Sequence, residues 1–135
     1  MRVLRLRSGL DAKTLFSRLD KEDAVAVRSD AIGSVEEAEL AFHLAQRAFA
    51  NKTNIAKKLK YEFLLWVSGK TDIASAMKTT APGERSDANG FLVVLFPGRE
   101  HENLLKLLDA EELPLKLKEK AEPLALERIS LSRIS

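Results

Sequence analysis

The spacing of hydrophobic and polar residues changes along the chain, and each spacing predicts a different element. Period two over residues 2–7 predicts a short strand, and Asp23–Arg28 has the character of a second one. The continuous apolar run Phe91–Phe96 is typical of a buried central strand. Apolar residues three and four positions apart, together with boundary signals, predict helices over residues 11–19, 34–50, 54–68, 72–78, 100–108 and 123–133. In the last of these, Ile129, Leu131 and Ile134 also fit a frayed strand.

The order of these elements indicates the fold class. Strands and helices mix without strict β-α-β alternation, so we expect an α+β protein. The expectation is a single domain, residues 1–135, with a small central β-sheet of about three to four strands packed with about six helices. The charged segment 111–122 shows no period that assigns it to an element.

Residue types at the helix boundaries predict where several helices begin and end. Ser34-Val-Glu-Glu37 is a capping box, in which the serine hydroxyl bonds the backbone N–H of Glu37 and the Glu37 carboxylate reaches back. Gly69 favours the positive φ that ends a helix, and Pro123 suits a first helical turn. Further caps are expected at Asp11, at Thr53 or Asn54, and at Thr71. The buried face of the helix over residues 54–68 is expected to comprise Ile55, Leu59, Phe63, Trp66 and Val67.

Composition narrows the class of protein. Of 135 residues, 45% are hydrophobic and 31% are charged, which is typical of a folded domain and not of a disordered chain. The chain has no cysteine, which excludes disulfides and thiolate metal sites and fits a reducing compartment. No apolar run approaches the ~18 residues of a membrane span, and the N-terminal residues lack the apolar core of a signal peptide. We therefore expect a cytoplasmic protein with no membrane partner.

No group of residues in the sequence predicts catalysis. Ser68-Gly-Lys-Thr71 resembles the end of a phosphate-binding loop, but that motif needs a glycine at position 64, which is a leucine inside a predicted helix. A helix stop followed by a helix cap explains the same residues. The two histidines, His43 and His101, are distant in sequence and have no cysteine to join them in a metal site. We expect no catalytic residues, no metal and no cofactor.

A basic segment surrounds the expected helix start at residue 54. Residues 51–60 contain four lysines and no acid, and a helix N-terminus adds a partial positive charge. Such a surface attracts phosphates, although on the sequence alone a solvated helix face is the simpler explanation. Lys57, Lys58 and Lys60 are expected on the exposed side of the helix. The candidate anion-binding residues are Lys52, Asn54, Lys57, Lys58 and Lys60, with Lys70 and Arg85 as extensions.

The last twelve residues, 124–135, are apolar for a chain end. Two explanations fit them equally well. The leucines and isoleucines either pack on the core of their own domain or form a surface for a partner.

Two segments of the chain resemble a known family. Over residues 54–77 the pattern is Asn54-x-Ala56, then Glu62 to Gly69 ending in Ser-Gly, then Ile73-x-x-Ala-Met77. The closing run Leu126-Glu-Arg-Ile-Ser-Leu131 is similar to the family's Leu-Glu-Arg-Ile-Ala-Leu. These motifs resemble the small kinase-binding, tRNA-recruiting subunit of the KEOPS complex (the TPRKB-type family). The sequence departs from the family at Thr80-Ala-Pro-Gly83, where a Gly-Ile pair is usual, and segment 111–122 has no counterpart.

The resemblance implies a role without a reaction. Such subunits bind the atypical kinase of the complex, contact the remaining KEOPS subunits indirectly, and recruit tRNA by its 3′ CCA end. The complex then adds threonylcarbamoyl to an adenosine of the tRNA through another, metal-bearing subunit. The resemblance favours the tRNA interpretation of the lysines and a kinase-binding role for the C-terminal helix. The expected kinase-binding residues are Leu126, Ile129, Leu131 and Ile134.

Two alternatives remain open on the sequence. The chain fits a protein-interaction module that never binds RNA, which tRNA binding by the isolated protein would exclude. It also fits a small enzyme or ligand-binding domain, which a deep pocket with converging polar groups would favour.

Overall fold

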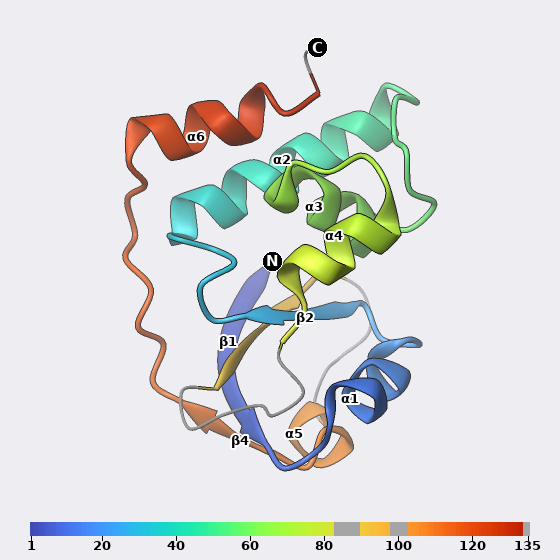
Figure 1. Cartoon of the computed structure of the whole chain (residues 1–135), viewed down its shortest axis with the longest axis vertical. Coiled ribbons are helices and arrows are strands. Elements are labelled where there is room, and N and C mark those ends of the chain that lie inside the picture. The colour runs from blue at the N-terminus through green and yellow to red at the C-terminus, as the bar shows by residue number, and fades with distance from the viewer. Residues whose placement is uncertain (83–89, 98–102, 134–135) are drawn as a thin grey trace. The chain divides into compact units, whose positions relative to one another are not determined.

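Strands and helices are both present in the computed structural model, which describes residues 1–82, 90–97 and 103–133. The α+β class is confirmed: the described residues form a four-stranded antiparallel sheet and six helices (Figure 1). Contacts along the chain group into two units, residues 1–29 with 81–116 and residues 30–80 with 117–135. The first unit contains the sheet and the second is helical. The single domain over residues 1–135 stays a prediction.

The sheet of the first unit consists of β1 (Arg2–Ser8), β2 (Ala24–Arg28), β3 (Phe91–Leu95) and β4 (Ala110–Leu113). Their order is β2-β3-β1-β4, and every neighbouring pair is antiparallel (Figure 1). All five residues of β3 are buried, as expected for a continuous apolar run in an inner strand. The predicted strands over residues 2–7, 23–28 and 91–96 are therefore confirmed to within one residue at each end.

One face of this sheet packs on α1 (Ala12–Leu19) and α5 (Leu104–Leu107) in one buried apolar cluster. Asp11 caps α1 as predicted, because its carboxylate accepts a hydrogen bond of 2.7 Å from the backbone N–H of Thr14. The buried cluster contains Leu6, Leu15, Leu19, Ala24, Ala26, Phe91, Val93, Leu95, Leu104 and Leu108.

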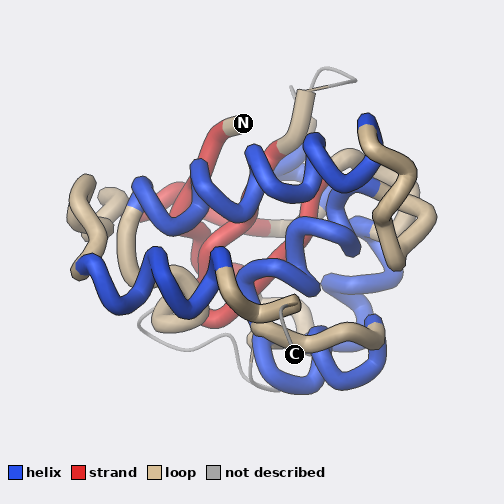
Figure 2. Tube along the Cα trace, turned by 90° about the horizontal axis from the view of Figure 1, so that it is seen from above, coloured by secondary structure: helices blue, strands red, loops and turns tan. Residues whose placement is uncertain are grey.

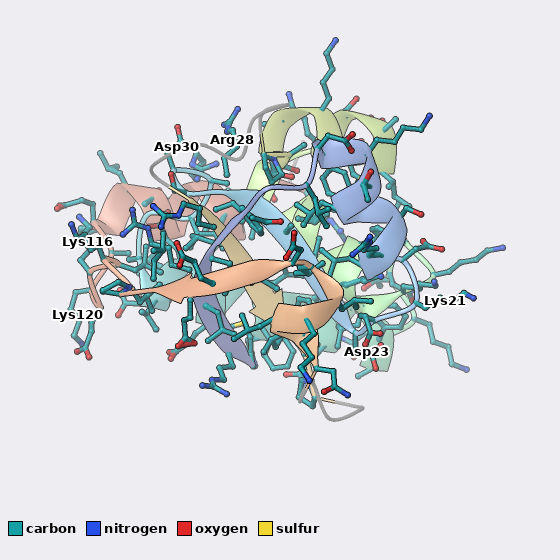
Figure 3. The ribbon with its side chains drawn as sticks, turned by 90° about the horizontal axis from the view of Figure 1, so that it is seen from below. Lys21, Asp23, Arg28, Asp30, Lys116 and Lys120 are labelled. Atoms are coloured by element: carbon teal, nitrogen blue, oxygen red, sulfur yellow. The ribbon has the colours of Figure 1, made fainter. Side chains whose placement is uncertain are left out.

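The pairing of the edge strand β2 continues into the turn that precedes it. Lys21 and Asp23 lie in the turn that precedes the strand, and Arg28 stands at its far end (Figure 3). The Asp23 carbonyl accepts a hydrogen bond of 2.9 Å from the N–H of Phe96. This bond extends the β2–β3 pairing by one step beyond the strands.

The second unit consists of α2 (Val35–Ala50), α3 (Leu59–Ser68), α4 (Ile73–Thr80) and α6 (Pro123–Ser130). Helix α2 packs on α3 and α6, and α3 also packs on α4. Figures 1 and 2 show α6 side by side with α2. Small residues along one side of α2 allow these close approaches. They are Ala38, Ala41, Ala45 and Ala48, all buried.

The N-terminus of α2 is capped from two directions. The predicted Ser34 cap is present, because Ser34 Oγ accepts from the Glu37 N–H at 3.1 Å. The Glu37 carboxylate reaches back, as predicted, and accepts from the Ser34 hydroxyl at 2.9 Å. The N–H groups of Val35 and Glu36 donate to the carbonyls of residues 118 and 119, both at 2.9 Å. The segment before α6 therefore closes the first turn of α2, and this helix end offers no free donors to an anion.

Several predicted boundaries are wrong. Helix α3 begins at Leu59 and not at residue 54, and Asp72 caps α4 in place of Thr71 because its carboxylate accepts from the Ser75 N–H at 2.8 Å. The last helix ends at Ser130. The strand β4 was not predicted, because its sequence Ala-Glu-Glu-Leu has no apolar period. The first residues of the predicted helix 100–108 lie outside the described ranges, and within them α5 spans Leu104–Leu107.

Candidate functional site: a basic loop held by a buried carboxylate

The loop between α2 and α3, residues 51–58 (the basic loop), places three lysines in solvent. Lys52, Lys57 and Lys58 are all exposed. Lys52 has a φ of 57°, in the left-handed region, which turns the chain away from the end of α2. The Thr53 N–H returns to the Ala48 carbonyl at 2.8 Å, so the turn is tied to α2 by a backbone hydrogen bond.

The second half of the basic loop is fixed by a side chain of α3. Glu62 Oε1 accepts hydrogen bonds from the backbone N–H groups of Ile55 and Ala56, each at 2.9 Å. Asn54 Nδ2 donates to the Ala56 carbonyl at 2.8 Å. Ala56 is 2% exposed and anchors the loop against the unit. Asn54 therefore stabilises a loop and does not cap a helix, which corrects the expectation from the sequence.

The carboxylate of Glu62 is fully buried and has a cation as its partner. Arg133 Nη1 lies 2.6 Å from Glu62 Oε2. The Arg133 guanidinium also stacks 4.1 Å from the centre of the Trp66 ring, a cation–π contact. Two backbone N–H groups bond one oxygen of this carboxylate, and the guanidinium pairs with the other. Among the described residues, Glu62 Oε2, Arg133 Nε and Arg133 Nη2 are buried without a hydrogen bond, so the charge is paired but its hydrogen bonds come from the loop amides alone.

The exposed end of the basic loop is electropositive. Lys52, Lys57 and Lys58 form no ion pair with any residue in the described ranges. Helix α3 starts directly after Lys58, and among the described residues no side chain caps it. The partial positive charge of a helix N-terminus adds to that of the lysines. Glu62 lies in the first turn, but its charge is offset by Arg133.

The structure does not bring all predicted anion-binding residues to this loop. Lys60 was expected in solvent but is 5% exposed, and its Nζ lies 5.2 Å from the Tyr61 ring centre. Lys70 follows Gly69 at the opposite end of α3, roughly 15 Å away for a ten-residue helix. Arg85 lies outside the described residues. The basic loop therefore retains Lys52, Asn54, Lys57 and Lys58 from the predicted set.

Burial divides the predicted kinase-binding residues of α6. Ile129 is 2% exposed and packs on the core of its own unit, so it is not available to a partner. Leu126 is half-buried, and Leu131 is 47% exposed. Ile134 lies outside the described residues. Leu124, which the sequence did not single out, is 76% exposed and lies two helical turns before Leu131.

Other candidate chemistry finds no support within the described ranges. Gly69 ends α3 with a φ of 71° and Asp72 caps α4, so residues 68–71 connect two helices and do not wrap phosphates. The described residues include no group of three or more acids or histidines placed to hold a metal ion. His43 is exposed on α2, and His101 lies outside the described residues. In the same ranges, none of the helices is long and apolar enough to cross a membrane.

Sequence reasoning missed Glu62 and Arg133 as residues that organise this site. A signal for Glu62 was present, because the family-like motif contains Asn54, Ala56 and Glu62, and these three residues hold the basic loop. No local signal pointed to Arg133, whose role depends on a contact with a distant part of the chain. Compared with known proteins, the chain matches no family model, and no curated protein matches its sequence. The resemblance to the KEOPS subunit therefore rests on the motifs alone.

Proposed function

We propose that this chain is a non-catalytic, cytoplasmic adaptor of the KEOPS type, which recruits tRNA and binds the kinase subunit. The observation that carries the proposal is the basic loop. Three exposed lysines, which form no ion pair with any described residue, lie on a segment that the family-like residues Asn54, Ala56 and Glu62 hold in place. A fixed loop with uncompensated cations is suited to bind a phosphate backbone.

The small net charge limits where RNA would bind. The whole chain carries a formal charge of +2, too low to attract nucleic acid over its entire surface. The basic loop is a local exception, and a single-stranded tRNA end is narrow enough to contact one loop. The proposed tRNA-binding residues are Lys52, Asn54, Lys57 and Lys58, with the 3′ CCA end as the target.

The proposed kinase-binding surface is the exposed side of α6. Leu124 and Leu131 leave apolar side chains in solvent there, while Ile129 on the opposite side anchors the helix. Exposed apolar residues that recur on one side of a helix are typical of a partner interface. Ile134, which lies outside the described residues, stays in the proposed surface because the sequence analysis predicted it.

The test is tRNA binding by the double variant Lys57→Glu/Lys58→Glu at several salt concentrations. We expect weaker binding, and a salt slope smaller in magnitude by at least about 1.4, which corresponds to two lost phosphate contacts on a single strand. Lys70→Glu is the matched control, because it removes a cation at the other end of α3. Equal binding by wild type and the double variant would exclude the basic loop as the tRNA site.

The proposed kinase-binding surface is tested with Leu124→Arg, since an already exposed position tolerates a charge without loss of the fold. We expect this variant to bind the kinase subunit more weakly in calorimetry while tRNA binding is unchanged. Unchanged kinase affinity would remove α6 from the interface.

A second candidate function is a protein-interaction module that binds no RNA. The exposure of Leu124 and Leu131 favours it, since those residues suit a protein partner and have no use in phosphate binding. A pull-down from native cytoplasm distinguishes the two. The kinase with tRNA supports the adaptor, and the kinase without tRNA supports the module.

A further inference from the structure

Glu62 connects two segments of the chain that have different proposed roles. One carboxylate oxygen, Oε1, accepts from the amides of Ile55 and Ala56 in the basic loop. The other, Oε2, lies 2.6 Å from the Arg133 guanidinium in the segment that follows α6. Because both oxygens belong to one rigid planar group, a movement of the carboxylate at one side changes the hydrogen bonds at the other.

Arg133 is well placed to hold that carboxylate still. Its side chain is 16% exposed, and its guanidinium contacts the Trp66 ring and pairs with Glu62 through Nη1. Its Nε and Nη2 are buried and have no hydrogen-bond partner among the described residues. Without Arg133, Glu62 would be a fully buried anion that lacks its countercharge, which destabilises the carboxylate in its present position. The two loop amides would then lose a charge-assisted acceptor, the stronger kind of hydrogen bond.

We propose that Arg133 is a positioning residue for the basic loop and acts through Glu62. The segment after α6 thus sets the order of a loop that is remote from it in sequence. Leu131 is exposed and lies two residues before Arg133, so a partner that binds α6 there can affect the Arg133–Glu62 contact. The expected effect of Arg133 on RNA binding rests on the proposed function. The coupling between Arg133 and the loop does not.

The Arg133–Glu62 contact would couple binding at α6 to binding at the basic loop, whichever ligand binds first. If a partner that docks on α6 stabilises the Arg133–Glu62 contact, it raises the affinity of the basic loop for its ligand. By thermodynamic linkage, the ligand of the loop then raises the affinity of the α6 partner by the same factor.

The first test needs no ligand. Amide hydrogen exchange in the free protein is compared between wild type and Arg133→Met, with the exchange of Ala41 and Ala45 in α2 as the reference for overall stability. We expect the amides of Ile55 and Ala56 to exchange about tenfold faster, or more, relative to that reference, since hydrogen bonds to charged groups are worth at least a factor of this size. Unchanged relative exchange at Ile55 and Ala56 would overturn the proposal.

Two further variants separate positioning from a general loss of charge. Arg128→Met is the matched control, because Arg128 also lies in the C-terminal region and pairs with a different carboxylate, Glu37, at 3.9 Å. It should leave the loop amides at their wild-type exchange. Arg133→Lys keeps the charge but loses the planar fork and the stacking, so the exchange of the loop should fall between wild type and Arg133→Met. Equal acceleration by Arg128→Met would overturn the proposal.

The second test uses tRNA and distinguishes positioning from direct contact. If Arg133 only positions the loop, Arg133→Met weakens tRNA binding while the salt slope stays at its wild-type value, because the number of phosphate contacts is unchanged. A smaller slope would make Arg133 a phosphate contact and overturn the positioning role. If the wild type binds no tRNA, the proposed function fails, while the exchange result decides the coupling independently.

Discussion

Two glycines show how a single residue can be required for different reasons. Gly69 and Gly90 both have positive φ, 71° and 72°, in the left-handed region that other residues rarely adopt. Among the described residues, a Cβ on Gly69 would meet only Ser132 Cβ at 3.8 Å, an ordinary contact. A Cβ on Gly90 would lie 2.6 Å from the Leu6 carbonyl oxygen, so the strand β1 would have to move.

Alanine at these two positions should therefore differ in cost. Gly69→Ala should lower the free energy of unfolding by about 1–2 kcal/mol, the cost of left-handed backbone for a residue with a Cβ. Gly90→Ala should lower it by more, since the backbone contact with Leu6 adds to the same conformational cost. Urea denaturation of the two variants checks the difference. Equal losses of unfolding free energy would mean that β1 shifts at Leu6 with little energetic cost.

At the scale of elements, α3 and α4 begin for different physical reasons. The residues before α3 are kept out of the helix because Glu62 binds the amides of Ile55 and Ala56. Helix α4 begins with an ordinary local cap, the carboxylate of Asp72. The hydrogen bond from the Ser75 backbone to that carboxylate lowers the pKa of Asp72 below its usual 3.8.

This cap predicts a pH dependence with a definite sign. A depressed pKa in the folded state means that the ionised cap stabilises the protein above about pH 4 and is lost as the pH falls through the folded pKa. Asp72→Asn keeps a capping oxygen that does not titrate. We expect its melting temperature to fall less than that of the wild type between about pH 5 and pH 2. Parallel melting curves for the two proteins over that range would contradict this role of Asp72.

At the scale of the whole molecule, contacts group into two units. Whether these units unfold together or separately can be measured. Trp66, the one tryptophan of the chain, belongs to the helical unit. Its fluorescence therefore reports the unfolding of that unit. The amide infrared band of β-structure reports the sheet of the first unit.

A single cooperative domain over residues 1–135 predicts that these two signals change together. We expect coincident thermal midpoints from Trp66 fluorescence and from the β-sheet band, as two-state unfolding requires. Phe63→Tyr, at a fully buried position of the helical unit, provides the check, because in one cooperative domain it lowers both midpoints equally. A lower midpoint for Trp66 alone would show that the two units unfold separately.

The sequence by itself determined the features whose causes are local. The apolar run at β3 and the caps at Asp11 and Ser34 were readable because burial of a continuous run and hydrogen bonds across three residues need no distant partner. The stop at Gly69 was readable because positive φ is a property of one residue. These signals were enough for the fold class and for the exposed lysines at positions 57 and 58.

The tertiary structure alone decided the features that depend on partners distant in sequence. The edge strand β4 forms because β1 offers unpaired backbone groups, with Glu111 opposite Arg7 and in an ion pair with it. Ile55 is 49% exposed, against expectation, because Glu62 holds its segment outside the helix. Glu62 itself is stable in the interior because the amides of Ile55 and Ala56 bond one of its oxygens and Arg133, from the C-terminal segment, pairs with the other. Local periodicity carries no information about such contacts, since they form only when the chain has folded.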